Sequence, residues 1–116
     1  MFYISKNGDT IHVVSNTNEF KRNSLSDIGG AFHLINAILD DTNSIFEDIA
    51  SMRGGAFYCD SCAFTFSGST FTNIRSLYGG VWYIYSYWTL VPFTASNIII
   101  TDIKANKDGG VAYILG

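Results

Sequence analysis

The chain consists of short runs in which apolar and polar residues alternate, with turn-forming residues between them. Phe64 and Phe66 flank Thr65 in the clearest example, and residues 2–4 follow the same pattern. Strict alternation over a few residues is typical of a strand with one buried face. Gly, Asn, Asp and Ser cluster between the runs, so the pattern predicts many short strands joined by tight turns.

One motif recurs along the chain: a glycine pair, a small residue and then, in most copies, an aromatic residue. Ala31, Ala56, Val81 and Val111 follow the glycine pairs at intervals of 25, 25 and 30 residues, and Met1 lies 30 residues before Ala31. Such a period marks stacked structural units. Since the repeat is cut at both ends, we expect one segment of a longer array. Its coils are residues 1–28, 29–53, 54–78, 79–108 and a partial coil 109–116.

Three short strands in each unit of 25–30 residues predict an all-β fold, a parallel β-helix (solenoid) of about four to five coils. Successive coils of such a fold stack at about 4.8 Å. Helical repeats of this period are disfavoured, because glycine pairs and β-branched residues interrupt every stretch that two amphipathic helices would need.

Stacking places equivalent residues in columns, and three columns are apolar enough to lie inside the coil. The first is Phe2, Phe32, Phe57, Trp82 and Ala112; the second is Ile4, Leu34, Cys59, Ile84 and Ile114; the third is Phe20, Phe46, Phe71 and Ile100. The first two share a parity along the predicted strand, so we expect both to point inward.

The position between the first two columns points outward by the same parity, and it is nearly all aromatic. We interpret it as the main candidate surface feature, with Trp88 as a possible addition from the 85–94 insert. It would pack against another protein chain, stack on sugar rings, or only stabilise the sheet through its own stacked rings. Its members are Tyr3, His33, Tyr58, Tyr83 and Tyr113.

Two groups of acidic residues are candidates for other roles. Asp48, Asn73 and Asp102 form a column after the third strand, which is interpreted as a hydrogen-bonded polar ladder at a turn rather than as a catalytic carboxylate pair. Asp40 and Asp41 are expected to lie in a turn.

Cys59 and Cys62 form a Cys-x-x-Cys motif. We favour a local disulfide in an oxidising compartment, followed by two free thiols. A metal site ranks last, because it needs two further ligands and the histidines, His12 and His33, lie on other units. No metal or other cofactor is expected.

Composition narrows the classes of function. The net charge is −3 and no Lys/Arg cluster offers a phosphate track, which argues against nucleic acid as a partner. The sequence has no apolar run of about 18 residues, so it predicts no transmembrane helix. Residues 1–20 lack the basic and then apolar layout of a signal peptide.

The segment Phe71-Thr72-Asn73-Ile74 followed by Gly79-Gly80 resembles the repeats of polymorphic outer-membrane proteins and related adhesins, and those of large surface proteins of ciliates. That resemblance implies a right-handed β-helix of the pectin-lyase-like type and an extracellular or cell-surface location. It also implies a structural or adhesive module rather than an enzyme. Because both ends of a stack of coils present unpaired strand edges, we expect end-to-end assembly into a filament, with other copies, neighbouring repeats or glycan as partners. The alternative is a polysaccharide-active β-helical enzyme, a lyase or glycoside hydrolase.

Overall fold

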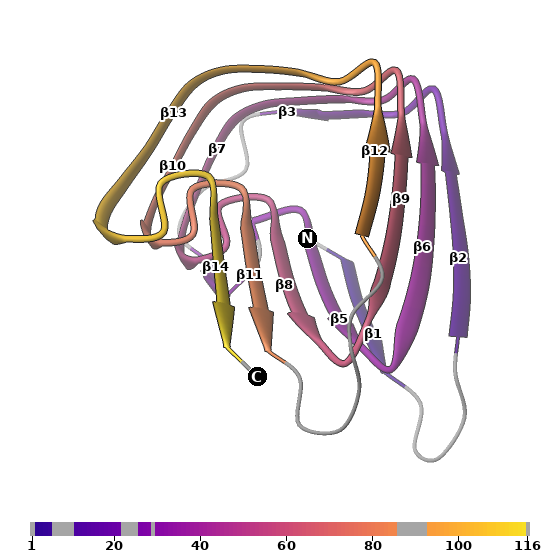
Figure 1. Ribbon diagram of the computed structural model, residues 1–116, viewed down its shortest axis with the longest axis horizontal. Helices are drawn as coiled ribbons and strands as arrows, with labels where there is room; N and C mark the ends of the chain where they lie inside the picture. Colours follow the sequence, from indigo (N-terminus) through magenta and orange to yellow (C-terminus); the bar gives the residue numbers. More distant parts are fainter. Residues whose placement is uncertain (1, 6–10, 22–25, 29, 86–92, 116) are drawn as a thin grey trace.

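The computed structural model describes residues 2–5, 11–21, 26–28, 30–85 and 93–115, and these form an all-β solenoid (Figure 1). Every strand pairing is parallel, as expected when each coil lies on the preceding one. Sheet A has the order β1 (Phe2–Ser5), β5 (Phe32–Ile35), β8 (Phe57–Asp60), β11 (Trp82–Tyr85) and β14 (Ala112–Leu115). Sheet B has the order β2 (Ile11–Asn16), β6 (Ala37–Thr42), β9 (Ala63–Ser67) and β12 (Phe93–Ser96). Sheet C contains β3 (Glu19–Lys21), β7 (Ile45–Arg53), β10 (Thr70–Tyr78) and β13 (Ile99–Asp108), with β4 (Ser26–Ile28) paired to β7.

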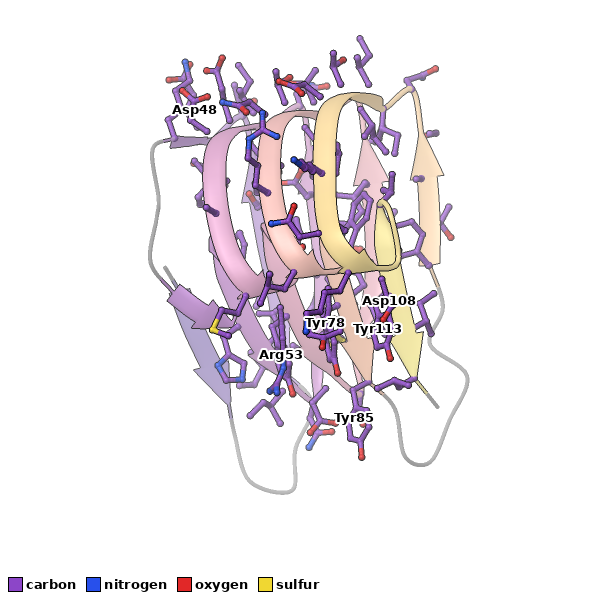
Figure 2. The ribbon with its side chains drawn as sticks, turned by 90° about the vertical axis from the view of Figure 1, so that its left-hand side faces the viewer. Asp48, Arg53, Tyr78, Tyr85, Asp108 and Tyr113 are labelled. Atoms are coloured by element: carbon purple, nitrogen blue, oxygen red, sulfur yellow. The ribbon has the colours of Figure 1, made fainter. Side chains whose placement is uncertain are left out.

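The chain in Figure 1 runs anticlockwise as it advances from the distant β1 to the near β14, and Figure 2 shows the same order of coils from the side. The solenoid is therefore right-handed, as predicted. The described residues make about three turns, slightly fewer than the four to five coils expected. The last coil contributes only β14 to the described solenoid.

Register confirms that like residues sit above like. In sheet A, Phe32 pairs with Phe57 and Phe57 with Trp82, so the first predicted column is continuous. In sheet C, Phe46 pairs with Phe71 and Phe71 with Ile100. Longer inserts in the 30-residue coils leave these pairings unchanged.

The core is a set of stacked aromatic rings around Phe57. The ring of Phe57 lies parallel to Phe32, with centroids 5.4 Å apart, and nearly parallel to Trp82 at 6.1 Å. Phe46 stacks on Phe71 at 4.9 Å in the neighbouring column. Each stacked pair contributes about 0.5–1.5 kcal/mol beyond the burial of its apolar area.

The corners of each coil use residues that tolerate left-handed backbone. Asn36 and Ser61 mark the corner between sheets A and B, with φ of 51° and 59°. A second corner lies between sheets B and C, and a third bends β7, β10 and β13. Asn and Asp adopt this conformation more readily than other L-residues, which explains the polar columns at the bends. The second corner has Thr17, Asn43, Gly68 and Asn97, and the third has Asp48, Asn73 and Asp102.

Two expectations were wrong, one about burial and one about the position of a turn. Ile100, Ala112 and Ile114 belong to interior columns but are exposed, Ile114 by 68%, because no described coil covers β13 and β14. Asp40 and Asp41 do not form a turn. Both lie in β6, and the corner comes later, at Asn43.

Candidate interaction surface

The outward aromatic column lies on sheet A as the alternation predicted. In β5, β8 and β11 the first and third residues are buried and the second and fourth are partly exposed. His33, Tyr58, Tyr83 and Tyr113 hold the second position of four successive strands and pair in register. The backbone of Tyr3 pairs with His33 in the same column, and Trp88 lies outside the described residues.

The rings of this column form a continuous ladder. Tyr58 and Tyr83 stack with centroids 5.3 Å apart and planes 8° from parallel, and Tyr83 stacks on Tyr113 at 5.1 Å and 23°. His33 meets Tyr58 edge-on at 4.9 Å. Both faces of the Tyr83 ring are therefore covered by neighbouring tyrosines. What the middle of the ladder offers a partner is ring edges and phenol groups, not open aromatic faces.

A second row runs beside the ladder, at the end of the sheet C strands. Arg53, Tyr78 and Asp108 occupy matching positions on β7, β10 and β13, because Tyr78 pairs with both of the others. Arg53 and Asp108 are exposed and Tyr78 is partly exposed. Figure 2 shows the three spread across the coils.

Tyr78 joins the two rows. Its ring packs at an angle on Tyr113, with centroids 5.7 Å apart, and Lys107 Nζ lies 6.0 Å from the centre of the same ring. The ladder and the row together form the tyrosine face, which we define as His33, Tyr58, Tyr83, Tyr113, Arg53, Tyr78 and Asp108. This face combines rigid aromatic groups with charges of both signs, a composition typical of protein interfaces.

Partial burial affects the titration of two groups in the ladder. Desolvation, followed by the neighbouring Tyr83 and Asp60, raises the pKa of Tyr58 above its ordinary value of 10.0. Desolvation lowers the pKa of His33, and the nearby Asp60 opposes this only in part. Both shifts favour the uncharged forms of Tyr58 and His33 at pH 7.

Cys59 and Cys62 are free, buried thiols in the structure. Cys59 occupies an interior column, and Cys62 Sγ lies 3.4 Å from the Leu34 carbonyl oxygen. Burial and the adjacent Cys62 thiol raise the pKa of Cys59, which makes it a poor nucleophile. The disulfide between them stays a prediction.

The acidic column at the third corner is a structural ladder, as interpreted from the sequence. Asn73 Nδ2 donates to Asp48 Oδ1 at 2.7 Å, and Arg75 Nη2 lies 3.5 Å from Asp102 Oδ2. Both carboxylates are thus engaged by neighbouring side chains.

Two acidic contacts were not anticipated. His12 on β2 pairs with Asp40 on β6, across the outer side of sheet B. Asp41 is buried and accepts a 2.5 Å hydrogen bond from Ser69 Oγ through Oδ2. The sequence contained a signal for this burial. If the strand is continued through Asp40 and Asp41, its alternation places Asp41 on the same inward side as Ala37 and Leu39.

The described part of the chain contains no helix long and apolar enough to cross a membrane. Within the same residues, no group of three or more His, Cys, Asp and Glu side chains is placed to hold a metal ion. No family model, curated protein or solved structure matches the chain.

Proposed function

We propose that the protein is a structural or adhesive module that works through contacts made by its outer faces and by the ends of its coils. The observation that carries the proposal is the unbroken ladder of Tyr58, Tyr83 and Tyr113 on the outer side of sheet A. A solenoid holds such a row at a fixed spacing, because each ring belongs to a separate coil of a rigid stack. A rigid aromatic row loses little side-chain entropy on binding, which favours its use as a contact surface.

Protein is a better partner for this face than a stacked sugar ring. A sugar packing on an aromatic residue needs an open ring face, and Tyr58 and Tyr113 cover both faces of Tyr83. Phenol groups and mixed charges suit hydrogen bonds and ion pairs with another chain. Glycan contact remains the second candidate partner, limited to ring edges and hydroxyl groups.

The resemblance of the Gly-Gly repeats to surface adhesins supports an extracellular or cell-surface location and a pectin-lyase-like ancestry as part of the same proposal. Filament formation is included, since exposed strand edges at both ends of a solenoid can pair with further coils. A polysaccharide-active enzyme is the alternative. It would need at least two free carboxylates on one face, whereas Asp48 and Asp102 are engaged at a backbone corner.

The test is removal of the ladder with the fold kept intact. Tyr58→Ala combined with Tyr83→Ala is expected to reduce self-association in sedimentation velocity and the formation of assemblies seen by electron microscopy. Thr65→Ala with Thr94→Ala is the matched control, because these exposed residues pair on the outer side of sheet B. Circular dichroism verifies that both variants fold.

Retention of the chain on insoluble cellulose, compared between the same two variants, tests the glycan alternative. Loss of assembly only in the tyrosine variant supports a protein-contact module. Assembly that is equal in the wild type and both variants would remove the tyrosine face from the proposal.

A further inference from the structure

The row beside the tyrosine ladder has an ordered sequence of charges. Arg53, Tyr78 and Asp108 lie on three successive strands, so these three side chains are positive, neutral and negative in order along the solenoid axis, with Lys107 Nζ 6.0 Å from the centre of the Tyr78 ring. Adjacent parallel strands are about 4.8 Å apart, which places the two charges about 10 Å apart with Tyr78 midway. Arg53 and Asp108 are exposed, and among the described residues neither forms an ion pair.

The tyrosine ladder is arranged around the same middle coil as the charged row. Tyr58, Tyr83 and Tyr113 each follow the corresponding member of the charged row by five residues. Tyr83 therefore lies level with Tyr78, and Tyr58 and Tyr113 lie one coil to either side. Consider an axis that lies in the plane of the face and runs from Tyr78 to Tyr83, perpendicular to the solenoid axis. Rotation by 180° about it exchanges the position of Tyr58 with that of Tyr113, and the position of Arg53 with that of Asp108.

We propose that the tyrosine face binds the same face of a second copy of this chain in an antiparallel, two-fold arrangement. The axis passes near Tyr78 and Tyr83, so Arg53 of each copy meets Asp108 of the other. In such an interface every contact occurs twice, which is the usual organisation of a homodimer. The inference rests on the proposed function, because it names the partner and the orientation for the contact surface described there.

Charge complementarity selects this orientation. In a parallel arrangement that brings the two charged rows together, Arg53 would face Arg53 and Asp108 would face Asp108, and like charges in contact disfavour a complex. The antiparallel arrangement replaces both repulsions with ion pairs. The rungs of both copies match in spacing, because the same strand separation sets them in each solenoid.

Charge reversal tests the orientation directly. Arg53→Asp or Asp108→Arg alone creates two like-charge contacts across the axis and is expected to weaken self-association by about tenfold or more. The double variant Arg53→Asp/Asp108→Arg restores opposite charges across the axis, and its association constant is expected to return to near the wild-type value. Lys104→Asp is the matched control for Arg53→Asp, because it makes the same change in net charge at an exposed position of sheet C outside the face. Sedimentation equilibrium at two salt concentrations measures all five proteins.

Cysteine crosslinking locates the axis. Tyr78→Cys lies near the axis and meets itself, so mild oxidation is expected to give a disulfide-linked dimer. Arg53→Cys and Asp108→Cys are each expected to crosslink poorly alone and efficiently when mixed. Cys59 and Cys62 are buried and provide little background under native conditions.

Restoration by the double reversal, together with the mixed crosslink, supports the antiparallel dimer. Weakened association in the double variant, or an Arg53→Cys variant that crosslinks with itself, overturns it. If the tyrosine variants abolish assembly while every charge reversal behaves as wild type, the orientation is wrong but the contact function stands. If the chain is monomeric at all concentrations, the dimer is excluded, and retention on cellulose then decides the wider proposal.

Discussion

At the scale of single residues, the glycine pairs explain how the coils approach one another. The first glycine of each described pair has a positive φ, for example 60° at Gly54. The second has no need of that conformation, but its backbone lies against the next coil. A methyl group on Gly55 would overlap the Gly80 carbonyl oxygen and the Ile74 Cγ2 atom. The second glycine is therefore required by packing between coils, and the first by backbone conformation.

Gly55→Ala is expected to lower the free energy of unfolding by about 1–3 kcal/mol or more, because the overlap with a backbone oxygen forces the coils apart. Gly110→Ala is the matched control: it occupies the same column, but an added methyl group would meet no atom there. We expect that change to be neutral or to stabilise by up to about 1 kcal/mol through the unfolded chain. Urea unfolding followed by tryptophan fluorescence measures both. Equal effects at the two positions would contradict the packing explanation.

The glycine repeats also separate what the sequence could predict about the fold and the surface from what it could not. The spacing of Gly55, Phe57 and Tyr58 was enough to predict coils, inward columns and an outward ladder, because parity and period are local properties. The order Arg53, Tyr78, Asp108 was missed, although each residue directly precedes a glycine pair. Ring orientation in the ladder was not predictable, because it depends on the packing of side chains from different coils.

At the scale of elements, the long strands of sheet C bend at residues with left-handed backbone. Asp48, Asn73 and Asp102 are the bend residues of β7, β10 and β13. The side chain of Asn73 also bonds to Asp48 in the coil below. The backbone geometry and this hydrogen bond thus agree with the polar ladder interpreted from the sequence. The sequence alone showed the column but not the φ angles that explain it.

Asn73→Ala is expected to lower the free energy of unfolding by about 1–3 kcal/mol, because alanine fits a positive φ poorly and the bond to Asp48 is lost. Asn73→Gly removes the same bond but permits the backbone conformation, so it is expected to cost about 0.5–1.5 kcal/mol. Thermal and urea unfolding compare the two variants. If glycine is as destabilising as alanine, backbone conformation is not what selects asparagine at this bend.

At the scale of the whole molecule, the last described coil of the solenoid differs from the coils in its middle. Ile84 and Ile114 belong to one interior column, yet Ile84 is buried and Ile114 is exposed. Phe93, Ile100 and Val111 are exposed on the same terminal coil for the same reason. Exposed apolar side chains beside an unpaired strand edge are a second candidate contact site, distinct from the tyrosine face. We therefore propose two separable routes of assembly, along the axis and across it.

Ile114→Lys is expected to block association along the axis and leave the tyrosine face unaffected. Because Ile114 is exposed, the change should alter the free energy of unfolding by less than about 0.5 kcal/mol. Ile84→Lys is the contrasting variant, since a charge at that buried position of the same column should prevent folding.

The measurement is made in an Arg53→Asp background, where lateral pairing is weakened and the remaining association reports on the ends. Light scattering against concentration should show association in Arg53→Asp and much less in Arg53→Asp/Ile114→Lys. Since end contact requires the apolar surface itself, added salt should strengthen the residual association or leave it unchanged, whereas salt should weaken lateral pairing. Residual association that falls with salt and ignores Ile114→Lys would mean that the open end makes no contact and that all assembly passes through charged faces.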